Sequence, residues 1–299
     1  MQYFLKSFSI IYILIYLAAL VTLIAFCSNP IIQMLIYISI ALTLIIIDKS
    51  LFEKTLILSL FIAIPIMIIN PVFNCMGVTT LLRVSGVPFI GYLNITLETL
   101  VYTLSLVLKL TNTILVFSLF NLLIQPDKML NLISLIAARS ALIITLTARL
   151  VPSMIDELKE IGEIQRTRGV NLDSKNLIQR VRNWFPFTKL ILFSSLENSY
   201  GISEAIQTKA YGIGKRSVFF SEMIKPRDLL LTANSILIFI LLYIGSNIKV
   251  MSYNFYPRLD KVDFSLKQII LALIILVLVL FPIMMAWGYS RWQYLRQKI

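Results

Sequence analysis

Six long apolar stretches constrain this chain more than any other feature. A helix needs about 20 mostly apolar residues to cross the hydrocarbon core of a bilayer. The stretches that reach or approach this length are Ser9–Phe26, Pro30–Ile47, Thr55–Ile69, Ile95–Ile124, Leu229–Ile248 and Ile269–Trp287. Since 58% of all residues are hydrophobic and only 14% are charged, the whole chain has the composition of a membrane protein. We therefore predict an all-α, polytopic membrane protein of about six transmembrane helices.

Positive charges follow one set of the loops between these stretches. Lys and Arg cluster before the first span, between the second and third, throughout the polar segment from Gln125 to Arg227, and after the last span. Because such residues accumulate on the cytoplasmic side of membrane proteins, we expect a cell-membrane protein whose N- and C-termini are both cytoplasmic. The opposite loops hold fewer cations, although the last of them is flanked or occupied by Lys249, Arg258, Lys261 and Lys267. This distribution explains the net charge of +12 without a nucleic-acid partner.

The polar segment divides the chain into three parts. We expect residues 1–124 to hold spans one to four, residues 125–228 to form a cytoplasmic helical domain, and residues 229–299 to hold spans five and six with a basic tail. A shorter interruption near residues 74–93 is rich in Gly, which favours turns, and there we expect a small outer hairpin or a re-entrant piece. No A-x-A-like site follows the first apolar stretch, which favours a transmembrane helix over a cleaved signal peptide.

Two amphipathic helices are expected within the polar segment. The first runs from Ala141 to Arg168 with a bend at Pro152. Its apolar residues recur at three- and four-residue steps, as on one face of a helix, at Val151, Met154, Ile155, Leu158 and Ile161. The second runs from about Pro186 to Ala210 and places three side chains four residues apart on one face, at Leu192, Leu196 and Tyr200.

Each of these helices ends in a similar short motif. The first motif reads Gln165-Arg166-Thr167-Arg168-Gly169, and the second reads Gln207-Thr208-Lys209-Ala210-Tyr211-Gly212. A cation in the last turn with Gly at or after it is an ordinary way to end a helix, so a single copy carries little weight. Two copies on one domain of a membrane protein favour a shared protein partner. Contact between the basic residues and anionic lipid is the alternative.

These motifs resemble those of the transmembrane T component of energy-coupling factor (ECF) transporters, the EcfT/CbiQ family. Thr167-Arg168-Gly169 is similar to the family's Ala-Arg-Gly box, and the second motif is similar to its Ala-Arg-Gly-Tyr-Gly box. The second box departs from the pattern, because Lys209 and Ala210 stand where the family has Arg and Gly. Similarities in the same order extend from about Asn70 to Ile248 and include Asn70-Pro71-Val72-Phe73-Asn74 with Gly77, Ala148-Arg149-Leu150-Val151-Pro152, and Lys225-Pro226-Arg227-Asp228.

The resemblance implies a scaffold that is not an enzyme. Members of this family belong to ABC-type importers of vitamins and of cobalt or nickel ions, in which a separate S component binds the substrate. Their two boxes lie at the ends of coupling helices that dock into two ABC ATPase subunits, as a homo- or heterodimer. The implied partners are therefore these ATPases, an S component and the lipid bilayer, with no cofactor and no metal. The implied docking residues are Arg166, Arg168, Gly169, Lys209, Ala210, Tyr211 and Gly212.

Two charged residues within the fourth apolar stretch are separate candidates. Charges inside a membrane are functional candidates by default, which applies to Glu98 and Lys109. For Lys109, a role in transport competes with a bond to backbone carbonyls between helices. For Glu98, the competing interpretation is a position at the outer interface.

Two other functions stay open. A conventional ABC permease would bind substrate in its own spans. An integral membrane enzyme acting on lipid or prenyl substrates would use the acidic residues of the first amphipathic helix, such as Asp156 and Glu160. Against an enzyme, the chain has no His, and a solvated helix face explains these carboxylates. The chain also has no G-x-x-x-x-G-K-[ST] loop, so we do not expect it to bind ATP itself.

Overall fold

The computed structural model describes residues 8–74, 77–87, 91–169, 176–211, 225–248, 250–260 and 266–291. The chain divides into two compact units. The first unit comprises Met1–Met129 and Met223–Ile299, and the second comprises Leu130–Glu222.

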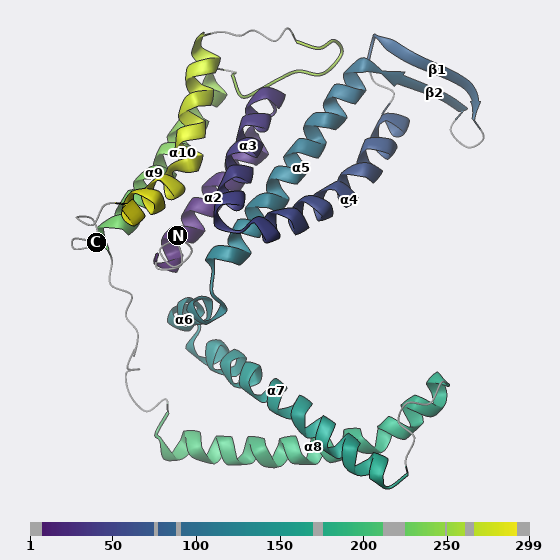
Figure 1. Ribbon diagram of the computed structural model, residues 1–299, viewed down its shortest axis with the longest axis vertical. Coiled ribbons are helices and arrows are strands. Elements are labelled where there is room, and N and C mark those ends of the chain that lie inside the picture. The colour runs from purple at the N-terminus through teal and green to yellow at the C-terminus, as the bar shows by residue number, and fades with distance from the viewer. Residues whose placement is uncertain are drawn as a thin grey trace. The chain divides into compact units, whose positions relative to one another are not determined.

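The described part of the first unit contains six apolar helices (Figure 1). Five of them are long and apolar enough to cross a membrane, and the remaining one, α2, has 17 residues, at the lower end of the usual range of about 17–25. The prediction of an all-α polytopic membrane protein is therefore confirmed. The six helices are α2 (Ile10–Phe26), α3 (Pro30–Ile47), α4 (Lys49–Phe73), α5 (Leu97–Leu123), α9 (Pro226–Asn247) and α10 (Leu266–Arg291).

Short polar side chains fix where several of these helices begin. Asn29 precedes Pro30 at the start of α3, and its side chain accepts a hydrogen bond from the backbone N–H of Ile31 at 3.1 Å. Asp48 does the same at the start of α4, where it accepts from the N–H of Leu51 at 3.2 Å. Such caps satisfy N–H groups that have no partner within the helix. They allow three successive apolar helices to be joined by very short turns.

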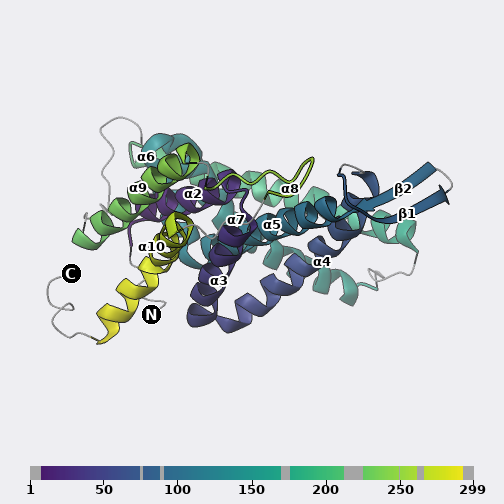
Figure 2. The ribbon, with the colours of Figure 1, turned by 90° about the horizontal axis from the view of Figure 1, so that it is seen from above.

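The apolar helices form a connected cluster (Figures 1 and 2). Helix α5 contacts α2, α3 and α4, helix α2 contacts α9, and α10 contacts both α3 and α9. Aliphatic side chains such as Leu20, Ile36 and Ile238 are fully buried between them. Hydrogen bonds across helices add to this packing, as where the hydroxyl of Tyr16 donates to the carbonyl of Val279 at 2.9 Å.

An antiparallel hairpin lies between α4 and α5 in the chain. Strand β1 (Thr80–Val87) pairs with β2 (Gly91–Thr96), and Figure 1 shows the hairpin extending from the start of α5. Of the two structures expected near residues 74–93, the structure contains the hairpin, while its position on the outer side of the membrane stays a prediction. The strand also shortens the fourth span at its start, because β2 takes up Ile95 and Thr96 before α5 begins at Leu97.

The second unit is built on two long helices, α7 (Ala138–Thr167) and α8 (Leu177–Thr208), which contact each other. A short helix, α6 (Pro126–Ile136), precedes them across the boundary between the units. Pro152 lies inside α7, as predicted for the first amphipathic helix.

The predicted start of the second amphipathic helix is wrong. Helix α8 begins at Leu177, so that Pro186 lies in its interior and not at its start. A proline inside a helix removes one backbone hydrogen bond, but here the neighbouring aromatic residues are packed. Phe187 is only 3% exposed, and its ring lies 5.7 Å from that of Trp184 in an edge-to-face arrangement. Aromatic pairs of this kind contribute about 0.5–1.5 kcal/mol beyond their burial, which offsets part of the loss.

Candidate functional site: two matching helix ends

Helix α7 ends at the first cationic motif. Arg168 is the C-cap residue, and Gly169 follows it with φ of +81°, in the left-handed region. The N–H of Gly169 donates to the carbonyl of Arg166 at 3.0 Å, and the N–H of Arg168 donates to that of Ile164 at 3.3 Å. A left-handed glycine after the C-cap is a common way to end a helix. The helix thus ends where the sequence predicts.

Helix α8 ends at the second motif in the same way. Lys209 is the C-cap residue, and Ala210 follows it with φ of +54°. The N–H of Ala210 donates to the carbonyl of Gln207 at 2.9 Å, and the N–H of Tyr211 donates to that of Ile206 at 3.2 Å. These two bonds are the pair that defines a Schellman motif. The turn is complete although an alanine occupies the position that usually requires glycine.

The two ends match position by position. The residue before each cation is a threonine whose hydroxyl donates to the carbonyl three residues earlier, at 2.6 Å for Thr167 and 3.1 Å for Thr208. Each cation then occupies the C-cap, and each left-handed residue follows it. The structure therefore extends the sequence similarity of the two motifs to their backbone conformation.

Both motifs are exposed and separate. The residues Arg166, Arg168, Gly169, Lys209, Ala210 and Tyr211 are all exposed, while Gly212 lies outside the described residues. Neither Arg168 nor Lys209 forms an ion pair with any residue that the structure describes. In Figure 1 the C-terminal ends of α7 and α8 point apart, so the structure does not bring the two motifs together into one site.

An apolar stripe runs along α8, the helix that ends at the second motif. Its members are spaced at three, four and seven residues, which places them on one face of the helix. They are all well exposed, from 61% to 79%, and comprise Ile178, Val181, Phe185, Leu192, Leu196 and Tyr200. The apolar face expected on α7 is less exposed. Met154, Leu158 and Ile161 are half-buried, whereas Val151 and Ile155 are 46% and 47% exposed. The sequence identified only the second half of the α8 stripe, because the helix begins earlier than expected.

The two charged residues of the fourth span have local partners. The ammonium of Lys109 donates to the carbonyl of Ala25 at 2.8 Å, which ties α5 to the end of α2. Glu98 is 1% exposed, and its carboxylate oxygens accept from the N–H of Thr79 at 3.1 and 3.3 Å. Both side chains thus join structural elements, and a transport role for Lys109 stays a prediction.

The acidic residues of α7 lie on an exposed face. Asp156 and Glu160 are exposed, and Asp156 pairs with Lys159 at 2.8 Å within the same helix. An exposed ion pair of this kind contributes little to stability. The described residues contain no group of three or more His, Cys, Asp or Glu side chains that could hold a metal ion.

The sequence did not identify the buried carboxylate of Asp228 as a site. Asp228 is 1% exposed at the start of α9, where its oxygens accept from the backbone N–H of Ser9 at 3.4 Å and of Lys225 at 3.2 Å. The bond to Lys225 is a local helix cap, which the order of residues could have suggested. The bond to Ser9 joins residues 219 positions apart, and no local pattern predicts it.

Membrane-crossing helices, together with a separate helical unit that carries two matched cationic helix ends, define a multi-pass membrane protein with an exposed helical domain. The CbiQ family model, described as cobalt transport protein, matches residues 9–218, more than two thirds of the chain. The chain belongs to this family. Helices α9 and α10 lie beyond the matched residues.

Individual relatives agree with the family. The chain is 29% identical to the energy-coupling factor transporter transmembrane protein EcfT of Clostridium kluyveri, over 38% of this chain and 46% of the relative. It is 30% identical to the EcfT protein of Streptococcus thermophilus, over 38% of this chain and 42% of the relative. A protein of Bifidobacterium longum named as an ABC transporter ATP-binding protein is 29% identical, over 38% of this chain and 14% of that protein. The chain spans less than half the length of each of these relatives.

Proposed function

We propose that this chain is the transmembrane T component of an ECF-type ABC importer and acts as a scaffold that is not an enzyme. In this role it transmits ATP-driven motion from two ABC ATPase subunits to a separate S component that binds a vitamin or a transition-metal ion. The observation that carries the proposal is the match between the ends of α7 and α8, where an exposed cation stands at each C-cap of a domain that is distinct from the apolar helices. Membership of the CbiQ family supports it.

Each helix end is suited to enter a groove on an ATPase. The side chains of Arg168 and Lys209 point from helix termini that no described part of the chain covers, and each can pair with a carboxylate or carbonyl of a partner. A cation also interacts favourably with the negative end of the helix dipole, which keeps it at the terminus. Two separate ends are needed if two ATPase subunits are engaged at once. The B. longum relative, named as an ABC transporter ATP-binding protein, supports this kind of partner.

The second unit lies in the cytoplasm in this proposal. Lys and Arg are concentrated in the polar segment and beside both termini of the chain, and such residues favour the cytoplasmic side. The N- and C-termini are then cytoplasmic too. This orientation presents both cationic ends to soluble ATPases.

The apolar stripe of α8 is the surface that we assign to the S component. Exposed apolar patches of this extent mark interaction sites in folded proteins. Covering Phe185, Leu192 and Leu196 would remove a large apolar area from water, which is the main favourable contribution to most associations. A helix that contacts the ATPases at its end and the S component along its length would couple their motions.

Co-purification tests the ATPase contact. We expect the double variant Arg168→Glu/Lys209→Glu, expressed with the ATPases of the same operon or genome, to recover far less ATPase than the wild type. The matched control is Arg182→Glu/Lys189→Glu, which makes the same change in charge at exposed positions of α8 away from its end. Undiminished ATPase recovery with the first variant would contradict the docking role. Equal loss of ATPase with both variants would also contradict it, because the loss would then follow from the change in charge and not from the helix ends.

A further inference from the structure

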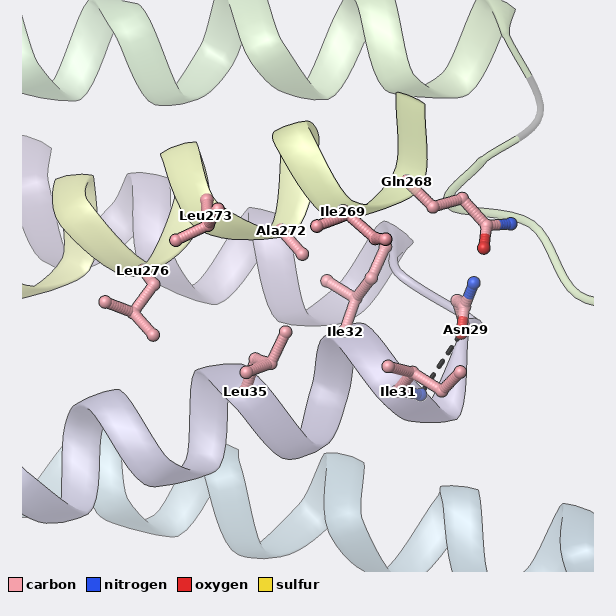
Figure 3. Close-up of a pocket in the computed structure, with 9 residues that line it drawn as sticks. All are labelled: Asn29, Ile31, Ile32, Leu35, Gln268, Ile269, Ala272, Leu273 and Leu276. Carbon is pink, nitrogen blue, oxygen red and sulfur yellow. Dashed lines mark hydrogen bonds between the residues drawn. The ribbon is translucent and has the colours of Figure 1, made fainter. Parts of the chain in front are cut away.

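A groove of about 250 Å³ lies between α3 and α10 (Figure 3). Its floor is formed by the buried side chains Ile32 and Ala272, and its walls by the half-buried Leu35 and Leu276. Leu273 stands on the rim and is 57% exposed. Helices α3 and α10 contact each other beside the groove, and Ala272 contributes only a methyl group to its floor.

One end of this groove is polar. Asn29 lies there at the start of α3, and Figure 3 shows Gln268 of α10 extending its amide toward the same end. The side-chain amide of Asn29 is already hydrogen-bonded within the protein. Its oxygen accepts from the backbone N–H of Ile31, and its nitrogen donates to the carbonyl of Val250 at 3.2 Å. Gln268 forms no hydrogen bond with the part of the chain that the structure describes, and its amide is available to a ligand.

We propose that this groove binds one acyl chain of a phospholipid, with the amide of Gln268 hydrogen-bonded to the ester region. Both walls belong to helices that are long and apolar enough to cross a membrane, so the medium around the groove is lipid. From Gln268 to Leu276 the α10 helix rises about 12 Å, which matches a portion of an extended hydrocarbon chain. The polar end lies where the helices begin, at the depth where lipid esters meet the hydrocarbon.

The size of the groove favours a chain over a helix of another protein. An α-helix with its side chains is about 10–12 Å across, whereas α3 and α10 contact each other beside this groove and leave a space of only about 250 Å³. Its volume is just below the range of about 300–1,000 Å³ that is typical of sites for drug-sized ligands. A single unbranched chain fits a small apolar space of this kind, and burial of each methylene stabilises it.

Native mass spectrometry of the full chain, purified in mild detergent and supplied with dioleoylphosphatidylglycerol, tests the site. We expect the wild type to retain one phospholipid, and Ala272→Leu and Ala272→Phe to retain it about tenfold less, because their side chains fill the floor. Gln268→Leu should retain the lipid less than the wild type, since it removes the polar contact but leaves the groove open. Ala233→Phe is the matched control on the exposed side of α9 and should retain the lipid as the wild type does.

Thermal unfolding separates loss of the site from loss of the fold. The phospholipid should raise the melting temperature of the wild type and of Ala233→Phe, and not that of Ala272→Leu. Equal retention by the wild type and Ala272→Leu would overturn the proposal, as would a wild type that retains no phospholipid. Cross-linking of Leu273→Cys to a segment of another protein in native membranes, in place of lipid, would also overturn it.

Discussion

Ala210 takes the same left-handed position after α8 that Gly169 takes after α7, with φ of +54° and +81°. An alanine in this region is strained, at a cost of roughly 1–2 kcal/mol, because its Cβ approaches the backbone carbonyl. The complete pair of hydrogen bonds at Ala210 and Tyr211 shows that the turn forms in spite of this cost. The turn keeps the exposed Lys209 at the C-cap of α8 although Ala210 is an unfavourable residue for the position that follows it.

Replacement of Ala210 by glycine should stabilise the end of α8. Ala210→Gly relieves the strain, and we expect the backbone amides of residue 210 and of Tyr211 to exchange up to about tenfold more slowly than in the wild type. Gly169→Ala should have the opposite effect at the end of α7. The control Ala205→Gly, in the exposed interior of α8, should destabilise the helix by about 0.5–1 kcal/mol. Faster exchange in Ala210→Gly would mean that the left-handed turn is not populated.

The two cations should contribute unequally to ATPase binding. Arg168 offers a planar fork that binds a carboxylate through two hydrogen bonds, whereas Lys209 offers a single ammonium. Truncation of one member of a desolvated charge pair costs about 2–5 kcal/mol, and we expect Arg168→Ala to fall in this range and Lys209→Ala below it. Lys209→Arg should strengthen binding. Titration of the ATPases onto the chain in nanodiscs measures all three, and a larger loss for Lys209→Ala than for Arg168→Ala would refute the ranking.

Gly77 should be required at the base of the hairpin. It has φ of +148°, and a Cβ at this position would lie 2.5 Å from the hydroxyl oxygen of Thr96 and 2.7 Å from a carboxylate oxygen of Glu98. In Gly77→Ala the side chains of Thr96 and Glu98 therefore have to shift. We expect this to weaken the bond between Glu98 and the N–H of Thr79 and to lower the stability by about 1–3 kcal/mol. Thermal unfolding in detergent measures it.

Gly288→Ala is the matched control for this substitution. It lies in α10 of the same unit, where an added Cβ meets nothing within 4 Å. Because alanine is the better helix former by about 0.5–1 kcal/mol, this variant should unfold at the same or a higher temperature than the wild type. Equal melting temperatures for Gly77→Ala and Gly288→Ala would show that the hairpin base tolerates a side chain.

Cys27 should resist alkylation in the folded protein. Its side chain is fully buried beside the turn between α2 and α3, and burial raises the pKa of its thiol to about 11. A raised pKa leaves only about one thiol in a thousand ionised at pH 8, and the thiolate is the form that reacts. In a Cys75→Ser background we expect iodoacetamide to modify Cys27 only after denaturation in SDS. Rapid modification at pH 8 without denaturant would contradict the burial.

Local sequence patterns predicted most of the elements but not their long-range contacts. Apolar runs located the spans, because a helix in lipid must be apolar along its whole length. The glycines near residues 74–93 indicated the hairpin, and Gly169 indicated the end of α7. Each of these signals acts within a few residues of the feature that it predicts.

The features that the sequence did not predict depend on partners far away in the chain. The sequence predicts that the second amphipathic helix begins at about Pro186, whereas α8 begins at Leu177 and encloses this proline next to the buried Phe187. The bond from Ser9 to Asp228 and the enclosure of Glu98 by Thr79 likewise depend on the assembled fold. The left-handed turn at Ala210 is a different case, because it is local. The similarity of the two motifs indicated a helix end there, but alanine rarely adopts this conformation, so its left-handed φ was not predicted.

Site-specific photo-crosslinking tests the central claim most directly. A photoreactive amino acid would replace Arg168, Lys209 or, as a control, the exposed Lys189 in the middle of α8, and the chain would be irradiated in membranes that contain the ATPases. The account predicts an adduct with an ATPase subunit from position 168 and from position 209, and none from position 189. Absence of ATPase adducts from both helix ends, in membranes where the ATPases co-purify with the chain, would contradict it.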